Sequence, residues 1–181
     1  LILNSGGPPP LKFNQLTITD LKKYFNQLFL GFFINEYVFI TLICFMISGL
    51  IYNVKPIRAK DLIYFDVIIE SVNNPIRMFI GWFAVVENAL IPLSLIIFYW
   101  FLGAFMMNAK RLSEWKKFDS KKDRLMYRPS LGNYDEQMLA VMCFVYAILS
   151  SSSLALFAAR YKFELILWLP FFILILGWYF K

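Results

Sequence analysis

The sequence predicts an all-α, multi-pass membrane protein with about five transmembrane helices. Of the 181 residues, 60% are hydrophobic and only 17% are charged, which is far from the composition of an average soluble domain. Crossing about 30 Å of hydrocarbon takes roughly 20 apolar residues as a helix, so this length allows about five spans. The sequence has no histidine, which excludes histidine-based catalysis and haem ligation through histidine in these residues.

Residues 1–36 are expected to form a tail followed by an amphipathic helix. The stretch NSGGPPP has turn and polyproline composition, whereas TITDLKKYFNQLFLGFF places apolar residues at helical spacing. Thr19 or Asp20 can cap this helix, which we expect to lie on the membrane surface; the alternative is that it forms the first turns of the next span. Because the chain starts with Leu1 and shows no signal-peptide pattern, we expect a processed chain or a fragment.

The remaining residues, 37–181, contain the five predicted spans. The stretch 89–107 has no charged side chain, and a very short turn at residues 160–162 separates the last two spans. Each segment has the length that a membrane helix needs. The predicted spans are residues 37–54, 62–86, 89–107, 138–159 and 163–180.

The basic residues of the loops predict an orientation. With five spans, residues 55–61 and 108–137 lie on one side of the membrane and contain three and eight Lys or Arg, whereas the opposite loops contain none and two. The positive-inside rule places the two basic loops in the cytoplasm, or in the matrix of an organelle. We therefore expect a bacterial cytoplasmic membrane or an organelle inner membrane, with both loops available to one site.

The predicted span at residues 62–86 is unusually polar. Asp66, Glu70, the pair Asn73 and Asn74, and Arg77 follow one another at spacings of three or four, which places them along one face of a helix. Charges in a membrane helix cost a few kcal/mol on insertion scales and must face a polar interior. The face forms either a structural polar seam between helices or the wall of a polar cavity. A proline within this span favours the cavity, because it frees a backbone carbonyl.

The long basic loop contains a second candidate region. Lys110, Arg111 and Glu114 occupy one helical turn beyond an apolar stretch, and the sequence YRPSLGNYDE follows at residues 127–136. A phosphate needs positive charge and several donors, and Arg provides a planar fork for it. The alternative is topology alone, with the loop attracted to anionic lipid. No groove-reading motif is present, so we do not expect nucleic acid as a partner.

Two motifs carry a resemblance to a known family. The stretch YNVKPIRAKDLIYFD resembles the Tyr-Ser-x-x-Pro-x-Arg-x-Lys…Asp segment that opens the second half of UbiA-superfamily intramembrane prenyltransferases. The stretch FLGAFMMNAKRLSEW, followed by YRPSLGNYDEQMLAVMCFVYA, is similar to the Lys-Arg-x-x-Glu…Tyr-Arg…Tyr pattern of their decaprenyl-phosphate phosphoribosyltransferase-like branch. The resemblance extends from residue 37 to the C-terminus.

The resemblance implies that residues 37–181 are the C-terminal half of a UbiA-like bundle of about nine spans. Such a bundle surrounds a cavity open to lipid and transfers groups between a polyprenyl lipid, or its phosphate, and a phosphate-bearing partner such as a phosphoribosyl donor. We assign no catalytic residue. The expected phosphate ligands are Arg58, Lys60, Arg77, Lys110, Arg111 and Arg128, and the expected polar cavity residues are Asp66, Asn74, Glu114 and Tyr134.

The sequence departs from the family pattern at both of its acidic motifs. Lys110, Arg111 and Glu114 stand where most relatives have an Asp-x-x-x-Asp pair, and the upstream Asn-Asp-x-x-Asp-x-x-x-Asp motif is missing. We therefore expect Mg²⁺ to be bound mainly by the absent half and assign no metal ligand here. The chain is either a transferase half that needs a partner supplying that motif, or an inactive UbiA-derived accessory subunit of a larger membrane complex.

Overall fold

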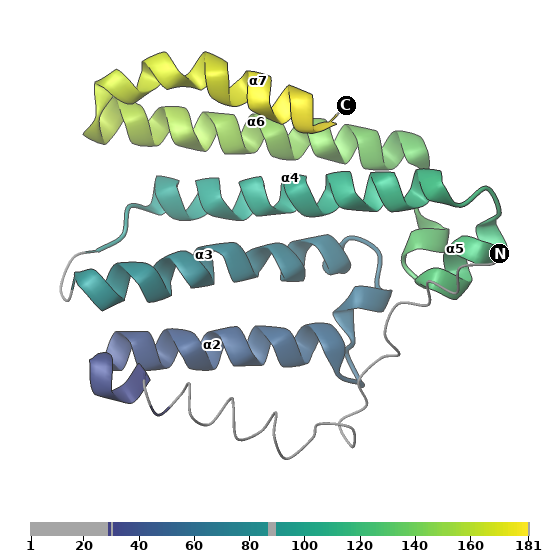
Figure 1. Cartoon of the computed structure of the whole chain (residues 1–181), viewed down its shortest axis with the longest axis horizontal. Helices are drawn as coiled ribbons and strands as arrows, with labels where there is room; N and C mark the ends of the chain where they lie inside the picture. The colour runs from purple at the N-terminus through teal and green to yellow at the C-terminus, as the bar shows by residue number, and fades with distance from the viewer. Residues whose placement is uncertain (1–28, 30, 87–89, 181) are drawn as a thin grey trace, which may run out of the picture.

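The computed structural model describes residues 29, 31–86 and 90–180, and all of its regular elements are helices and turns. The predicted tail and amphipathic helix lie largely outside these residues. Figure 1 shows that α2, Glu36–Asn53, α3, Phe65–Val85, α4, Leu93–Lys117, and α6, Glu136–Tyr161, lie side by side in the order of the sequence. The all-α prediction is confirmed.

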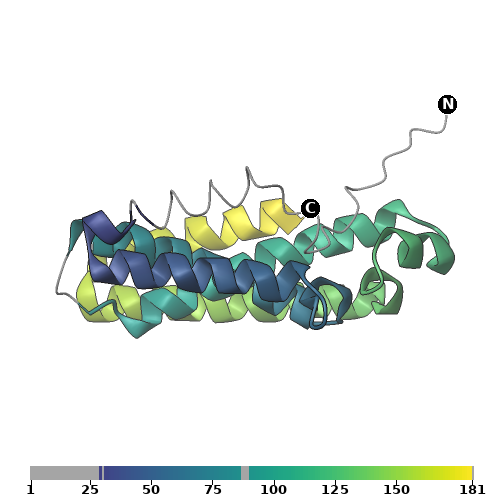
Figure 2. The ribbon, with the colours of Figure 1, turned by 90° about the horizontal axis from the view of Figure 1, so that it is seen from below.

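The chain turns back after α6 and covers one side of this layer. A 3₁₀ helix, η4 (Phe163–Trp168), leads into α7 (Leu169–Phe180), which packs on α6. Figure 2 shows α7 on one side of the layer of long helices. We predicted one helix over residues 163–180, but Pro170 has no N–H to bond with the carbonyl of Ile166, and the α-helix begins only at Leu169, directly before the proline.

Among the described residues, four helical segments are long and apolar enough to cross a membrane: Glu36–Asn53, Leu93–Lys117, Glu136–Tyr161 and Phe163–Phe180. The fifth predicted span, α3, has 21 residues and runs beside α2 and α4, but its charged side chains lower its mean hydropathy. The prediction of about five spans is therefore close. The predicted span at 89–107 begins later, at Leu93, and continues to Lys117, because the turn with Arg111 and Glu114 extends the same helix.

Short elements connect the long helices at the end of the layer where α2 finishes and α3 begins. The first connection contains η2 (Ala59–Asp61), and the second contains α5 (Lys121–Tyr127) and η3 (Leu131–Asn133). The hydroxyl of Ser130 donates a hydrogen bond to the carbonyl of Lys60 over 3.1 Å. The two basic loops therefore meet at one end of the molecule.

Helices α3 and α4 approach closely at Gly103. A Cβ atom at this position would overlap the side-chain amide of Asn74 and would lie 3.3 Å from the carbonyl oxygen of Ser71. Ser71 is fully buried, and Ala104 beside the glycine is 2% exposed. Small residues at such an interface allow the backbones of two membrane helices to come together. The contact fixes the position of α3 along α4.

We expect Gly103→Val to separate α3 from α4, because the added methyl groups have no space beside Asn74 and Ser71. Overpacking a close contact typically costs about 1–3 kcal/mol, and thermal unfolding in detergent should show a lower melting temperature. Gly81→Val is the matched control, since a Cβ at Gly81 meets no atom within 4 Å among the described residues. Equal melting temperatures of the two variants would contradict the close contact.

Candidate functional site

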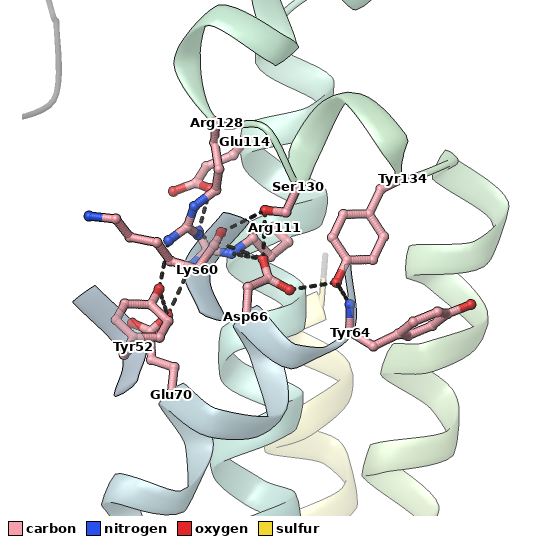
Figure 3. A network of polar contacts seen from close by, with 10 residues as sticks. All are labelled: Tyr52, Lys60, Tyr64, Asp66, Glu70, Arg111, Glu114, Arg128, Ser130 and Tyr134. Carbon is pink, nitrogen blue, oxygen red and sulfur yellow. Dashed lines mark hydrogen bonds and ion pairs between the residues drawn. The ribbon is translucent and has the colours of Figure 1, made fainter. Parts of the chain in front are cut away.

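A buried polar cluster lies where the two basic loops meet. It joins the last turn of α2, the first turns of α3, the charged turn of α4 and the loop before α6. Figure 3 shows most of these side chains pointing toward one another, whereas those of Lys60 and Tyr64 extend away from the others. The cluster consists of Tyr52, Lys60, Tyr64, Asp66, Glu70, Arg111, Glu114, Arg128, Ser130 and Tyr134.

Arg111 stands among three carboxylates. Its Nη1 donates to Glu114 Oε2 over 2.5 Å, its Nη2 donates to Glu70 Oε2 over 3.0 Å, and its Nε lies 3.3 Å from Asp66 Oδ2. The side chain of Arg111 is only 3% exposed. The planar fork of a guanidinium can serve several carboxylates at once, which a lysine ammonium cannot do with the same geometry. Arg111 therefore links α4 to α3 by charge.

Asp66 is fully buried and has partners on both oxygens. Oδ1 accepts a hydrogen bond of 2.6 Å from the hydroxyl of Tyr134, and Oδ2 lies 3.0 Å from the hydroxyl of Ser130, whose one proton it shares with the carbonyl of Lys60. Oδ2 also faces Arg111 at 3.3 Å and Arg128 Nη1 at 3.8 Å. The carboxylate lies in the first turn of α3, where the helix dipole favours negative charge. Asp66 thus connects the start of α3 with α4 and with the following loop.

Arg128 brings the end of α2 into the cluster. Its Nη2 donates to the hydroxyl of Tyr52 over 2.6 Å, and that hydroxyl donates to Glu70 Oε2 over 2.6 Å. The Arg128 guanidinium is 14% exposed at the side chain, more than that of Arg111. The Tyr52 hydroxyl therefore bridges Arg128 and Glu70 at the edge of the cluster.

Tyr134 fastens the loop before α6 to α3. Its hydroxyl accepts a hydrogen bond of 2.7 Å from the backbone N–H of Tyr64 and donates to Asp66. Its backbone carbonyl accepts a hydrogen bond of 3.0 Å from the indole N–H of Trp115. Burial, followed by the negative charge of Asp66, raises the pKa of Tyr134 above its ordinary value. The phenol therefore stays protonated and remains a donor to Asp66 at neutral pH.

Lys60 and Arg58 form a basic edge beside Arg128. Burial lowers the pKa of Lys60, the charges of Arg58 and Arg128 lower it further, and the negative charge of Asp61 opposes them. Figure 3 shows the Lys60 side chain extending away from Asp66. Arg58 Nε lies 2.9 Å from Asp61 Oδ2, and no ion pair of Lys60 is found among the described residues. Three cations thus gather at one rim of the cluster.

The structure brings most of the predicted site residues together but leaves three apart. Lys110 is exposed on α4, Asn74 lies against Gly103, and the exposed Arg77 stands 5.5 Å from the ring centre of Phe45. Those that converge are Arg58, Lys60, Asp66, Arg111, Glu114, Arg128 and Tyr134.

Sequence reasoning missed four members of the cluster, namely Tyr52, Tyr64, Glu70 and Ser130. Glu70 was placed on the polar face of α3 but was not assigned to the site, although its spacing of four from Asp66 predicted the shared face. Tyr52 begins the YNVKP motif, which was the available signal. Ser130 carried no signal in the sequence, because only the folded loop brings its hydroxyl to Asp66.

The cluster does not fit a divalent metal ion. A cation-binding carboxylate group needs room for the ion among its oxygens, but the Arg111 guanidinium fills the space between Asp66, Glu70 and Glu114. Within the described part of the chain, no group of three or more His, Cys, Asp or Glu side chains could hold a metal. Arg111 supplies the positive charge that these carboxylates require.

The arrangement of the helices defines a UbiA-like, all-α membrane fold. The chain is similar in structure to a UbiA homolog from Archaeoglobus fulgidus that was solved bound to Cd²⁺, with a TM-score of 0.71 and 17% sequence identity. The match covers 92% of this chain and 62% of that protein, so the chain spans less than two thirds of its length. No protein-family model and no curated protein matches the sequence.

We expect Arg111→Met to destabilise the protein strongly, because three carboxylates would lose their shared counter-charge. Removing one partner of a buried ion pair typically costs about 3–5 kcal/mol, which thermal or denaturant unfolding in detergent should detect. Arg77→Met is the control, since Arg77 is exposed and lies outside the cluster. Adding Asp66→Asn to Arg111→Met should restore part of the stability, and an unchanged double variant would contradict the proposed pairing.

Proposed function

We propose that the chain forms part of a UbiA-like transferase in a membrane and that Arg58, Lys60 and Arg128 bind phosphate. The phosphate would belong to a polyprenyl phosphate or to its phosphate-bearing partner, such as a phosphoribosyl donor. The observation that carries the proposal is the position of these cations at the rim of the cluster, where the Lys60 side chain extends away from Asp66 and Arg128 donates to the neutral hydroxyl of Tyr52 over 2.6 Å. The UbiA-like fold supports it.

The rim offers anion binding that the centre of the cluster lacks. In the centre, Asp66, Glu70 and Glu114 outnumber the guanidinium groups of Arg111 and Arg128, so an added phosphate would meet excess negative charge. At the rim, Lys60 extends away from these acids, as Figure 3 shows. A charge-assisted contact from an ammonium or guanidinium to phosphate is about twice as strong as a neutral hydrogen bond.

The rim cations suit a transfer with a pyrophosphate leaving group. In phosphoribosyl transfer, a phosphate oxygen of the lipid forms a bond to the anomeric carbon of the donor. The bond from that carbon to pyrophosphate breaks, and its electron pair leaves with pyrophosphate. Positioned cations stabilise the charge that grows on the leaving group. We infer this role for Lys60 and Arg128.

The proposal includes a further membrane segment that supplies the Asp-rich motif. The carboxylates of the described cluster are already paired with Arg111, so they are unsuited to binding magnesium pyrophosphate. The longer UbiA homolog supports the need for additional helices. We also propose that residues 55–61 and 108–137 face the cytoplasm or the matrix, where soluble phosphate donors are present.

A second candidate function is that of an inactive accessory subunit in a larger membrane complex. The observation that favours it is the pairing inside the cluster, which supports the fold through Arg111 without any ligand. Pyrophosphate binding by the purified chain separates the two candidates. Binding at the rim supports the transferase, whereas a folded chain that binds neither pyrophosphate nor polyprenyl phosphate supports the accessory subunit.

We expect Lys60→Ala to weaken pyrophosphate binding by about tenfold to a hundredfold, since a charged hydrogen bond contributes roughly 1.5–3 kcal/mol. Isothermal titration calorimetry in detergent would measure the dissociation constant. Lys110→Ala removes the same charge from an exposed position outside the cluster and should leave the affinity unchanged. If both variants bind equally well, phosphate binding at the rim is refuted.

The affinity for pyrophosphate should also fall as the pH rises. This fall should begin at a lower pH than it would for a lysine with an ordinary pKa. The pKa of Lys60 is lowered, so in the free protein its ammonium loses the proton earlier as the pH rises, and affinity is retained only below that pKa. Lys60→Arg keeps its charge throughout this range and should abolish the decline. An identical pH profile for the Lys60→Arg variant would exclude Lys60 as the titrating group.

A further inference from the structure

The backbone of Tyr64 is strained at the entrance to α3. Its φ is 66° and its ψ is −44°, a region that residues with a Cβ atom rarely adopt. The N–H of Phe65 donates to the carbonyl of Ile63 over 2.8 Å. Residues 63–65 thus form a γ-turn of the rare kind with positive φ, which is strained in proteins.

The strained turn is held on both sides by hydrogen bonds. The N–H of Tyr64 donates to the hydroxyl of Tyr134 over 2.7 Å, and its carbonyl accepts from Val67 and Ile68 in the first turn of α3. The rings of Tyr64 and Tyr134 meet edge to face with their centres 6.3 Å apart, as Figure 3 allows the reader to follow. Such conformations persist only where the surroundings determine them fully.

The turn sets the position of Asp66. Tyr134 uses one hydroxyl for two bonds, because it accepts from the Tyr64 N–H and donates to Asp66. The other oxygen of Asp66 faces Arg111 at 3.3 Å and Arg128 at 3.8 Å. A relaxed turn with negative φ would direct the chain differently into α3 and would move Asp66 relative to both guanidinium groups.

We propose that Tyr64 is a positioning residue. Its strained turn, held by Tyr134, fixes Asp66 and through Asp66 places Arg128 at the basic rim. The ligand in this inference rests on the proposed function, whereas the strain and the placement of Asp66 do not. A glycine would adopt the turn without strain, so a tyrosine here retains a conformation that stability alone disfavours.

The test compares Tyr64→Gly with Tyr64→Ala in the full chain. Both variants lack the ring, but only Tyr64→Ala keeps the Cβ atom that strains the turn. We expect Tyr64→Gly to melt roughly 3–6 °C above Tyr64→Ala, because the strain is relieved. We also expect it to bind pyrophosphate about fivefold to tenfold more weakly, because Asp66 and Arg128 are then held less firmly.

Each result decides one part of the inference. A melting temperature of Tyr64→Gly equal to or below that of Tyr64→Ala overturns the strain. Equal affinity of the two variants for pyrophosphate overturns the positioning role. A merely structural turn would raise the melting temperature in the glycine variant without weakening the ligand.

A second measurement distinguishes a failure of the proposed function from a failure of the positioning role. If the unsubstituted chain binds no pyrophosphate, the coupling between Asp66→Asn and Arg128→Gln is measured from melting temperatures in the Tyr64→Gly and Tyr64→Ala backgrounds. We expect a smaller coupling in the glycine background, because Asp66 is less firmly placed. Equal coupling in the two backgrounds overturns the positioning role independently of any ligand.

Discussion

The guanidinium of Arg111 among three carboxylates is the interaction on which the arrangement of α3 and α4 depends. Burying an ion costs several kcal/mol unless a partner stands beside it, so the helices must keep their register. Gly103 sets that register at its contact with Asn74. Arg111 lies eight residues after Gly103 on α4. Asp66 lies eight residues before Asn74 on α3. At about 1.5 Å per residue both separations cover roughly 12 Å, so the close contact and the ion pair support each other.

The same geometry explains how much of the site could be predicted from the sequence. Charged residues in apolar helices must find partners, and this rule predicted that Asp66 faces a polar interior. The family resemblance added Arg111 and Glu114 to the same site. The rule gave no distance along the helix, however. Arg77 shares a face with Asp66 but lies eleven residues further, or roughly 16 Å, which is too far for a common ligand contact. Lys110 neighbours Arg111 in sequence, but consecutive helical residues point in different directions.

The loops were less predictable than the helices because their contacts are made only in the folded chain. Hydropathy located the long helices, and a proline explains the divided last segment. Ser130 and Tyr134 reach Asp66 across more than sixty residues of sequence, through separations of 64 and 68. The strained turn at Tyr64 contains no glycine at its positive-φ position, so nothing in the sequence indicated it. Local propensity disfavours this turn, and only the surrounding hydrogen bonds retain it.

The division of charge between centre and rim limits where an anion can bind. An anion that took Arg111 would leave the buried Asp66 and the half-buried Glu70 and Glu114 without their counter-charge, which costs more than a surface contact returns. Arg128 is held less tightly, since it lies 3.8 Å from Asp66 and its main hydrogen bond goes to the neutral hydroxyl of Tyr52. Asp66 would keep Arg111, Ser130 and Tyr134 if Arg128 turned toward a ligand. The cluster can therefore give one guanidinium to an anion at the rim while Arg111 keeps its three carboxylate partners.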